Sequence, residues 1–334
     1  MFNYIVKKVA YGLLVMLGVI TLIFVLFNLL PGDPARMMLG QNADRESIEI
    51  LHKELGLDKP VYVQYFNYLN DLSPIGFDKD GSFGFKTPDL RRSYQSGRSV
   101  SSILADSFPN TILLAVVSIA FAFVVGVSLG ALAAIYSDTW FEKFVLVITS
   151  LGMSLPSFFA AILIAWFFAF ILADYTGLSM FGSLYSVDDF GNGEYIDLKN
   201  LILPALTLGI RPLAVICELT KSTMKEVLQQ DYIRTAKAKG LSKFQIITKH
   251  ALRNTLNPVV SSISGWFASL IAGAVFVEYI FDWKGVGVVI VDSLEKYDFP
   301  VLMGSLIVIC VMLIIINILT DITYAALDPR IKNE

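Results

Sequence analysis

The sequence predicts an all-α integral membrane protein with six transmembrane helices, and both its composition and the length of its apolar blocks lead to this fold class. Of the 334 residues, 55% are hydrophobic and only 16% are charged, whereas a soluble domain is roughly half apolar and about a quarter charged. Crossing a bilayer takes roughly 20 apolar helical residues. Because lipid offers no partner to backbone polar groups, each such block is expected to be helical.

Five uncharged blocks have about the length of a membrane crossing, and a sixth is interrupted by Arg211. In chain order, the blocks comprise residues 9–30, 112–135, 144–172, 201–217, 259–277 and 301–319. The first has 22 residues, more than the apolar core of a typical signal peptide, and no small-x-small cleavage site follows it. It is therefore expected to be an uncleaved span. Pro156 lies inside the third block and predicts a kink or a strong tilt.

Positive charge predicts which side of the membrane each loop faces, because Lys and Arg near span ends favour the cytoplasm. One set of short loops and termini holds 13 Lys and Arg, whereas the opposite short loops hold three. The basic side is therefore expected to be cytoplasmic, with both termini on it. Residues 31–106, 173–200 and 282–300 are then expected outside.

Residues 31–106 are expected to form an external subdomain, since this segment of 76 residues carries 11 acids against 9 bases. Within it, residues 46–57 have helical apolar spacing closed by Gly56, and a second amphipathic stretch, VYVQYFNYLNDL, follows Pro60. These two helices suit the membrane surface, the mouths of other helices or a solvent-facing subdomain. The sequence therefore predicts three parts: a first transmembrane helix (1–30), the external segment (31–106) and a five-helix core (107–328) that includes a cytoplasmic loop (220–256).

The cytoplasmic segment from residue 231 to residue 260 carries six Lys or Arg and one acid. A short helix is predicted over residues 232–239, and Gly240 can take the left-handed conformation that ends it. Ser242 and Gln245 then predict a capping box at the start of a second helix. The segment is thus expected to be a rigid helix–turn–helix. The alternative is that its charges only set orientation and contact anionic lipid.

The second helix of this segment is expected to have an apolar face made by Phe244, Ile247 and Ala251. Asn257 and Pro258 fit the cap and the first helical position of the following span. The segment would then enter the membrane without a flexible linker.

Polar and small residues within the predicted spans are candidates for function or for packing. A charge at mid-bilayer costs at least about 2.5 to 3.5 kcal/mol, so Arg211 is expected to face protein or water. Glu278 and Asp321 lie near span ends, where water is expected to reach them. Gly126 and Gly130 form a small-xxx-small pattern, which favours close contact between helices.

Several kinds of site are missing from the sequence. It contains neither a G-x-x-x-x-G-K-[ST] phosphate loop nor a G-x-S-x-G motif. His52 and His250 are expected on opposite sides of the membrane, so they cannot form a paired metal or catalytic site. Cys217 and Cys310 lie in apolar surroundings and are interpreted as packing residues. No catalytic or metal site is therefore predicted, and the chain is not expected to be an enzyme.

Seven stretches spread over nearly the whole chain carry a family resemblance. They are LLPGDPA, LGLDKPVYVQYFNYL, SFPNTILLA, ILPALTLGIRPLA, DYIRTAKAKGLSKFQIITKHALRN, VFVEYIFDWKGVG and DITYAALDPRI. Together they resemble the ABC importer permeases, in particular the first-type permease subunit of the oligopeptide and dipeptide (peptide/nickel) branch. The resemblance implies a type I ABC importer permease fold with a large external loop between helices 1 and 2. It also implies uptake of oligopeptides or dipeptides, with nickel complexes or glutathione as the alternative substrates.

In that family, a Glu-Ala-Ala…Gly pattern forms the cytoplasmic helix that docks into a groove on the ATPase subunit. Here Arg234, Thr235 and Ala236 stand at the Glu-Ala-Ala places, and Gly240 stands at the glycine. The resemblance therefore implies an ATPase-coupling segment made by Asp231, Tyr232, Arg234, Thr235, Ala236, Lys237, Ala238, Lys239 and Gly240. It departs from the general pattern by an Arg at the Glu position, and Arg253 stands in place of Pro.

The resemblance gives Arg211 two possible roles. It lines a translocation path and attracts a peptide carboxylate, or it pairs with helix carbonyls or with a partner subunit. Glu218 and Lys221 stand where relatives usually show Arg in the segment before the loop. The tight external loop that contains Asp282 and Trp283 would have a docking or gating role by analogy with the family.

The partners implied by the family are a second homologous permease, two P-loop ATPase subunits that bind ATP-Mg, an external substrate-binding lipoprotein and the peptide, in a bacterial inner membrane. No cofactor is implied in this chain, and no nucleic acid. A self-sufficient secondary carrier or channel is the rival class, but it would need mid-membrane carboxylates and inverted repeats, and neither is visible. A membrane-anchored sensor would need one or two spans rather than six.

Overall fold

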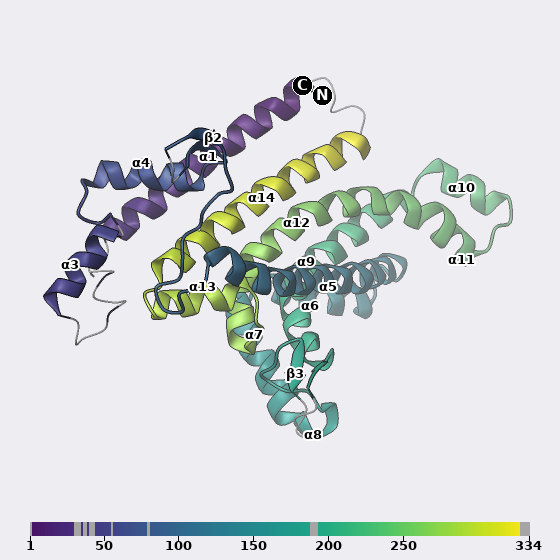
Figure 1. The fold of residues 1–334 in the computed structure, drawn as a ribbon. Coiled ribbons are helices and arrows are strands. Elements are labelled where there is room, and N and C mark those ends of the chain that lie inside the picture. The colour runs from purple at the N-terminus through teal and green to yellow at the C-terminus, as the bar shows by residue number, and fades with distance from the viewer. Residues whose placement is uncertain are drawn as a thin grey trace. The chain divides into compact units, whose positions relative to one another are not determined.

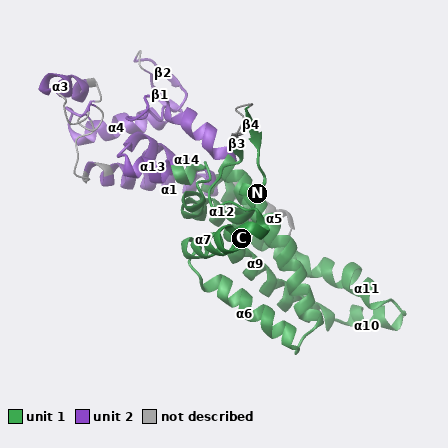
Figure 2. Ribbon diagram, turned by 90° about the horizontal axis from the view of Figure 1, so that it is seen from below, with its two compact units in different colours: residues 1, 110–288, 313–334 green, residues 2–109, 289–312 purple. Residues whose placement is uncertain are grey.

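The computed structural model describes residues 2–29, 35, 39, 44–54, 56–78, 81–187 and 193–327. It consists mainly of helices, with two small antiparallel hairpins (Figure 1). The chain forms two compact units (Figure 2). Unit 1 contains residues 110–288 and 313–334, and unit 2 contains residues 2–109 and 289–312.

Four helices of the described chain are long and apolar enough to cross a membrane: α1 (Phe2–Leu29), α5 (Val100–Ile135), α9 (Lys199–Leu228) and α14 (Phe299–Leu327). Two pairs of helices, each bent at a short break, are together long and apolar enough to cross as well. They are Trp140–Ser154 with Ser157–Ile171, and Lys243–Ile263 with Gly265–Phe281. If each bent pair is one span, the described residues contain up to 6 spans. This agrees with the six predicted from the apolar blocks.

The predicted kink at Pro156 is a break between two helices. Helix α6 (Trp140–Ser154) ends before it, α7 (Ser157–Trp166) begins after it, and their directions differ by 115°. Leu155 has the extended angles φ −76° and ψ 131°, as expected for a residue before proline, because the proline ring disfavours the helical conformation there. Helix α7 continues into a π-helical turn, η1 (Phe167–Ile171).

The prediction that Asn257 and Pro258 start the fifth span is wrong. Helix α12 (Leu252–Phe281) begins before them and contains Pro258 in its interior. It follows directly on α11 (Lys243–Gln245) and the π-helical turn η2 (Ile246–Ala251). Proline inside a membrane helix is tolerated, because neighbouring groups can satisfy the freed carbonyl.

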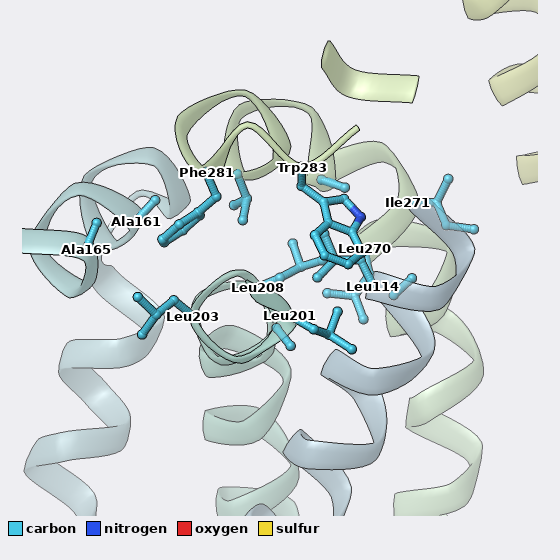
Figure 3. Packing of buried hydrophobic residues seen from close by; sticks show 14 of the residues in the cluster. Leu114, Ala161, Ala165, Leu201, Leu203, Leu208, Leu270, Ile271, Phe281 and Trp283 are labelled. Carbon is cyan, nitrogen blue, oxygen red and sulfur yellow. The ribbon is translucent and has the colours of Figure 1, made fainter. Parts of the chain in front are cut away.

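The core of unit 1 is built around α9, which packs against α12, α6 and α7. Large side chains from α9, α12 and the loop after α12 converge in its main apolar cluster (Figure 3). The small-xxx-small prediction is confirmed, because Gly126 and Gly130 of α5 lie directly against α9. A Cβ atom at Gly126 would lie 2.9 Å from the carbonyl oxygen of Leu213, and one at Gly130 would collide with the carbonyl of Cys217.

The remaining elements of unit 1 are short. Helix α8 (Ala173–Thr176) and the antiparallel strands β3 (Tyr185–Val187) and β4 (Glu194–Ile196) lie between η1 and α9. Helix α10 (Asp231–Ala238) follows α9. Helix α13 (Val286–Glu295) begins in unit 1 and continues into unit 2.

Unit 2 contains both helices predicted in the external segment. They are α3 (Arg45–Glu54) and α4 (Val61–Leu72), and Gly56 has the expected positive φ of 67°. Strands β1 (Ile75–Phe77) and β2 (Phe83–Phe85) then pair as an antiparallel hairpin.

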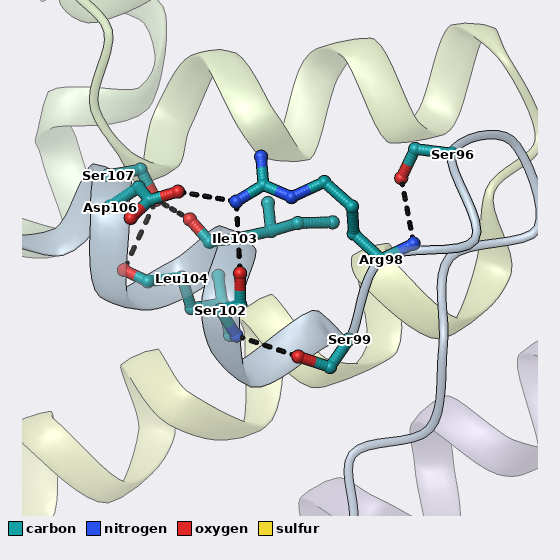
Figure 4. Close-up of polar contacts among 8 residues, drawn as sticks. All are labelled: Ser96, Arg98, Ser99, Ser102, Ile103, Leu104, Asp106 and Ser107. Atoms are coloured by element: carbon teal, nitrogen blue, oxygen red, sulfur yellow. Dashed lines mark hydrogen bonds and ion pairs between the residues drawn. The ribbon is translucent and has the colours of Figure 1, made fainter.

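Side-chain hydrogen bonds fix the segment that leads from this hairpin into α5. The carboxylate of Asp298 accepts hydrogen bonds from the Ser93 hydroxyl and from the backbone N–H groups of Tyr94 and Gln95. Arg98 donates to Asp106 and to Ser102 across the first turns of α5 (Figure 4). The backbone before α5 is thereby held to the residue that precedes α14.

Candidate functional site

The predicted helix–turn–helix is present between the end of α9 and the start of α12 (Figure 1). Helix α10 ends at Ala238, and Gly240 has φ 76°, the left-handed conformation that the sequence predicted. The predicted capping box is confirmed: the Gln245 N–H donates to Ser242 Oγ at 3.3 Å, and the Ser242 N–H donates to Gln245 Oε1 at 3.2 Å. The turn is therefore fixed by local backbone and side-chain geometry.

One side of this hairpin is buried against the ends of α5 and α9 within unit 1. Ile233 and Ala236 of α10 pack in one apolar cluster with side chains from the ends of α5 and α9 and from η2. That cluster also contains Ala134, Met224, Val227, Ile246 and Ala251. Ile233 is fully buried, and its position was not identified from the sequence. A displacement of α10 must therefore act on the spans that it packs against, because a close-packed contact cannot be compressed.

Eight of the nine residues assigned to the coupling segment face outward, and Ala236 alone among them is buried. The exposed residues are Asp231, Tyr232, Arg234, Thr235, Lys237, Ala238, Lys239 and Gly240. The hairpin thus has a buried apolar side and an open polar side. A segment with these two sides is held to its own chain by the apolar side and can bind a partner through the polar side.

The predicted apolar face of the second helix is partly wrong. Phe244 is 74% exposed, whereas Ile246 is buried together with Ala251. These two buried residues are five positions apart, which is the spacing of the i→i+5 hydrogen bonds in the π-helical turn η2 that contains them. The prediction assumed the α-helical repeat and therefore placed Phe244 inside. Phe244 instead offers an exposed aromatic ring near the turn.

The open side of the hairpin is positively charged. Six Lys and Arg side chains are exposed on it: Arg234, Lys237, Lys239, Lys243, Lys249 and Arg253. Arg234 forms an ion pair with Asp231 at 3.2 Å, but both side chains are highly exposed, so this pair contributes little stability. Among the described residues, the other five form no ion pair. Their charge is available to an acidic partner surface.

Polar contacts join the hairpin and its supports. The Asn254 amide of α12 donates to the Tyr232 hydroxyl of α10 at 2.7 Å. Lys225 near the end of α9 forms an ion pair of 2.7 Å with Glu142 of α6, and Glu142 also accepts the N–H of Asp138 at 2.6 Å. This Glu–Lys pair was not identified from the sequence, since its members are 83 positions apart. The first contact joins α12 to α10, and the second joins α6 to the end of α9.

Arg211 lies on an exposed strip of α9. Its side chain is exposed, and no described residue forms a hydrogen bond or ion pair with it. The exposed residues Glu218, Ser222 and Glu226 follow at intervals of seven, four and four positions, so the four side chains share one helix face. Among the described residues, no helix carbonyl accepts a hydrogen bond from Arg211. A charged face on a membrane helix requires water or a partner subunit against it.

The prediction that Glu278 reaches water is wrong, because its side chain is fully buried. Its Oε2 atom accepts the Gly287 N–H at 2.6 Å, at the start of α13. Trp283 is also fully buried, and its indole N–H donates to the Asn110 carbonyl at 3.0 Å. The loop after α12, which the sequence predicted to be external, is therefore packed onto α5 at Asn110. The side chain of Asp321, the other predicted span-end acid, lies outside the described residues.

Comparisons with solved structures support the fold. The chain matches two structures of the MetNI methionine ABC transporter in inward-facing conformations, with TM-scores of 0.53 and 0.54. Each match covers 68% of this chain and 97% of the other, at 16% and 17% sequence identity respectively. At this identity the likeness concerns the fold, which is that of a type I ABC transporter permease.

Comparisons with curated proteins cover the whole chain. It is 36% identical to a protein of Brucella suis biovar 1 named as a peptide permease, over 99% of both chains. It is 34% identical to the glutathione transport system permease protein GsiC of Escherichia coli K12, over 99% of both. It is 32% identical to the dipeptide transport system permease protein DppB of Alkalihalophilus pseudofirmus, over 99% of this chain and 100% of that protein.

Two family models divide the sequence between them. Residues 1–115 match the N-terminal model of the binding-protein-dependent transport system membrane component. Residues 126–333 match the model of the inner membrane component itself. The chain therefore belongs to the family of binding-protein-dependent transport system inner membrane components, the permease subunits of ABC importers.

Proposed function

We propose that this permease takes up oligopeptides or dipeptides delivered by an external binding protein, and that it is driven through its basic hairpin by separate ATPase subunits. The observation that supports this proposal is the two-sided hairpin. Its inner side is packed on the ends of α5 and α9 by Ile233 and Ala236, and its outer side presents six cations. The chain itself is proposed to be non-catalytic.

The hairpin is suited to transmit force. An ATPase groove that closes on the outer side of α10 would move the helix as a rigid body, because Gly240 and the capping box fix the turn. The packed side chains would pass this motion to α9, and the Asn254–Tyr232 hydrogen bond would pass it to α12. Rigid-body movement of packed helices is how a transporter alternates access between the two sides of the membrane.

The proposed assembly contains a second homologous permease, two ATPase subunits that bind ATP-Mg and an external binding protein. Each ATPase groove needs one hairpin, so a second permease supplies the other. The proposed location is a bacterial inner membrane with both termini in the cytoplasm. The exposed cations of the hairpin support this orientation, because positive loops favour the cytoplasmic side.

Peptides are the substrate class best supported by the relatives, two of which are named for peptides or dipeptides. Glutathione is the second candidate, since a relative of similar identity is named for its transport. Nickel complexes remain the alternative from the sequence resemblance alone. Competition between labelled dipeptide, glutathione and a nickel complex, in cells that carry the whole transporter, distinguishes the three.

We expect the purified chain alone to carry no solute across a vesicle membrane, because all of its movement is proposed to come through the hairpin. Liposomes containing this chain would show the same leak of labelled dipeptide as empty liposomes. Liposomes that also contain the second permease and the ATPases, with binding protein and ATP supplied on the appropriate sides, would accumulate it. Solute flux through the chain alone would support the secondary carrier and overturn the proposal.

Replacing Arg211 with alanine is expected to reduce peptide uptake at least tenfold if the exposed strip of α9 lines the path. A hydrogen bond between Arg211 and a peptide carboxylate would contribute about 1.5 to 3 kcal/mol, and about 1.4 kcal/mol corresponds to a tenfold change. Arg211→Lys retains the charge and should recover part of the uptake. Ser222→Ala lies on the same face without a charge and serves as the control. Unchanged uptake in Arg211→Ala would exclude Arg211 from the path.

A further inference from the structure

The amphipathic helix α4 of unit 2 packs against the membrane spans themselves. The ring of Phe24 in α1 lies 5.2 Å from that of Tyr65 and 6.0 Å from that of Tyr68. The hydroxyls of Thr21 and Tyr65 are 2.6 Å apart and share a hydrogen bond. The apolar cluster around these contacts also includes Ile307, Met303 and Leu306 of α14. Helix α4 is thus held against α1, in a cluster that α14 also joins.

The positions of these contacts along α1 give the depth of α4. The apolar span of α1 is Val6–Leu26, and α4 contacts it at Thr21 and Phe24. These residues lie five and two positions from the span end, or about 8 Å and 3 Å along the helix at about 1.5 Å per residue. Because half of a hydrocarbon core is about 15 Å thick, α4 lies within one leaflet.

Helix α14 contributes to the same apolar cluster. Its apolar span begins at Phe299, and its cluster residues from Met303 to Ile307 lie four to eight positions inside the span, or about 6 Å to 12 Å at about 1.5 Å per residue. Val311, about 18 Å inside, lies past the midplane. The leaflet of α4 is therefore set by its direct contacts with Thr21 and Phe24 of α1.

The other face of α4 has no cover within the described chain. Val61, Tyr62 and Phe66 are between 56% and 66% exposed. Asn67 beside them is the one other exposed residue of this helix. The face therefore carries no charge. Its tyrosine hydroxyl and its amide are suited to the boundary between acyl chains and headgroups.

The β1–β2 hairpin presents a second uncharged face. Ile75 pairs with Phe85 and Phe77 pairs with Phe83, so these four side chains point to one side. They are between 49% and 90% exposed. The opposite side is fixed to α4, because the Asn70 side chain exchanges hydrogen bonds with the backbone of Phe77.

A glycine allows the hairpin to lie this close to α4. A Cβ atom at Gly76 would collide with the Asn70 side chain. The first hairpin residue, Ile75, is three positions after Leu72, which still packs in the cluster on the spans. Three extended residues reach about 10 Å at most, so the hairpin begins near the depth of α4.

We propose that lipid covers the far face of α4 and the four-residue apolar face of the hairpin, so that this part of unit 2 is an interfacial anchor in one leaflet. A water-soluble protein cannot reach a surface that lies below the end of a membrane span. Aromatic rings and amides without charge also favour the membrane interface. In the proposed orientation this is the external leaflet. This placement of α4 requires only that α1 spans a bilayer.

Spin labels on the full chain in lipid vesicles test this anchor. Cys217 and Cys310 are replaced by alanine, and single cysteines are then introduced as Phe66→Cys on α4 and Phe85→Cys on the hairpin. Leu14→Cys, on the exposed lipid side of α1, is the control for lipid. Lys237→Cys, on the exposed basic hairpin, is the control for water. Each variant must elute as one species and retain its helical circular dichroism.

The readout is the ratio of collision rates with oxygen, which partitions into lipid, and with a water-soluble nickel chelate, which does not. We expect the ratio at positions 66 and 85 to resemble that at 14 and to exceed that at 237 by roughly tenfold, because polar solutes are excluded from hydrocarbon. If the ratio at positions 66 and 85 resembles that at position 237, the labels face water and the proposal is overturned. If both reagents collide rarely with these labels, protein covers the face and the proposal is overturned as well.

The same labels in the assembled transporter separate lipid from a partner subunit. If position 66 or 85 loses oxygen contact only after the second permease is added, the face is a subunit interface and the lipid anchor is rejected for the working transporter. Retained oxygen contact supports the anchor. A lipid signal at 66 with a water signal at 85 would remove the hairpin from the proposal and leave α4.

Discussion

Replacing Gly240 with proline is expected to abolish ATP-driven uptake while the subunit remains in the membrane. Gly240 has φ 76° and donates its N–H to the Lys237 carbonyl at 3.0 Å. Proline fixes φ near −65° and has no N–H, so it can adopt neither feature. The turn would open, and the cations of α10 would no longer face the direction set by Ile233 and Ala236. Uptake of labelled dipeptide is measured in cells that carry the whole transporter, normalised to the amount of subunit in the membrane.

Two further substitutions isolate the backbone as the cause. A Cβ atom at Gly240 would have no atom within 4 Å, so a side chain there meets no steric obstacle. Gly240→Asn should retain most uptake, because asparagine tolerates the left-handed region. Uptake in Gly240→Ala should lie between that of Gly240→Asn and that of Gly240→Pro. Holding alanine in the left-handed conformation destabilises the turn by about 1 to 2 kcal/mol. Normal uptake in Gly240→Pro would contradict the coupling role, and loss of that variant from the membrane would indicate misfolding instead.

Features that depend on residues a few positions apart were predicted well from the sequence. The end of α10 at a glycine, the capping box of Ser242 with Gln245 and the break at Pro156 are of this kind. Each is decided by the conformational range of one residue or by a side chain that reaches its own backbone. The membrane spans are also identified from local information, since the length and composition of each apolar block suffice.

Features that depend on packing between distant segments were predicted poorly. Glu278 was expected near water, but the backbone of α13 and the loop after α12 fold over it. Phe244 was placed inside because nothing in the local pattern indicated the π-helical turn that turns it outward. The Glu142–Lys225 pair joins two helices whose proximity follows from the tertiary fold. In each case the information lies in a neighbour that sequence spacing does not identify.

The substitution Gly287→Ala is expected to destabilise unit 1 by about 1 to 3 kcal/mol, the usual cost of an extra methyl group in a closely packed site. A Cβ atom at Gly287 would lie 2.5 Å from Cα of Val275, which is backbone and cannot rotate away, and 2.7 Å from Oε2 of Glu278. Relief of both contacts requires α13 to move away from α12. That movement would break the hydrogen bond of 2.6 Å between the Gly287 N–H and Glu278. Thermal unfolding of the detergent-solubilised chain measures the effect.

The matched control is Gly273→Ala on the same helix as Glu278, since a Cβ atom there would have no atom within 4 Å. It should leave the unfolding temperature unchanged or raise it slightly, because alanine is the better helix former. Glu278→Leu should destabilise the chain as Gly287→Ala does, since it removes the acceptor and leaves the buried N–H of Gly287 unpaired. Glu278→Gln retains an oxygen acceptor and should have the smaller effect. If Glu278→Leu unfolds at the temperature of the unmodified chain, the buried carboxyl group does not hold the loop, and the burial of Trp283 against Asn110 must be sufficient to fix it.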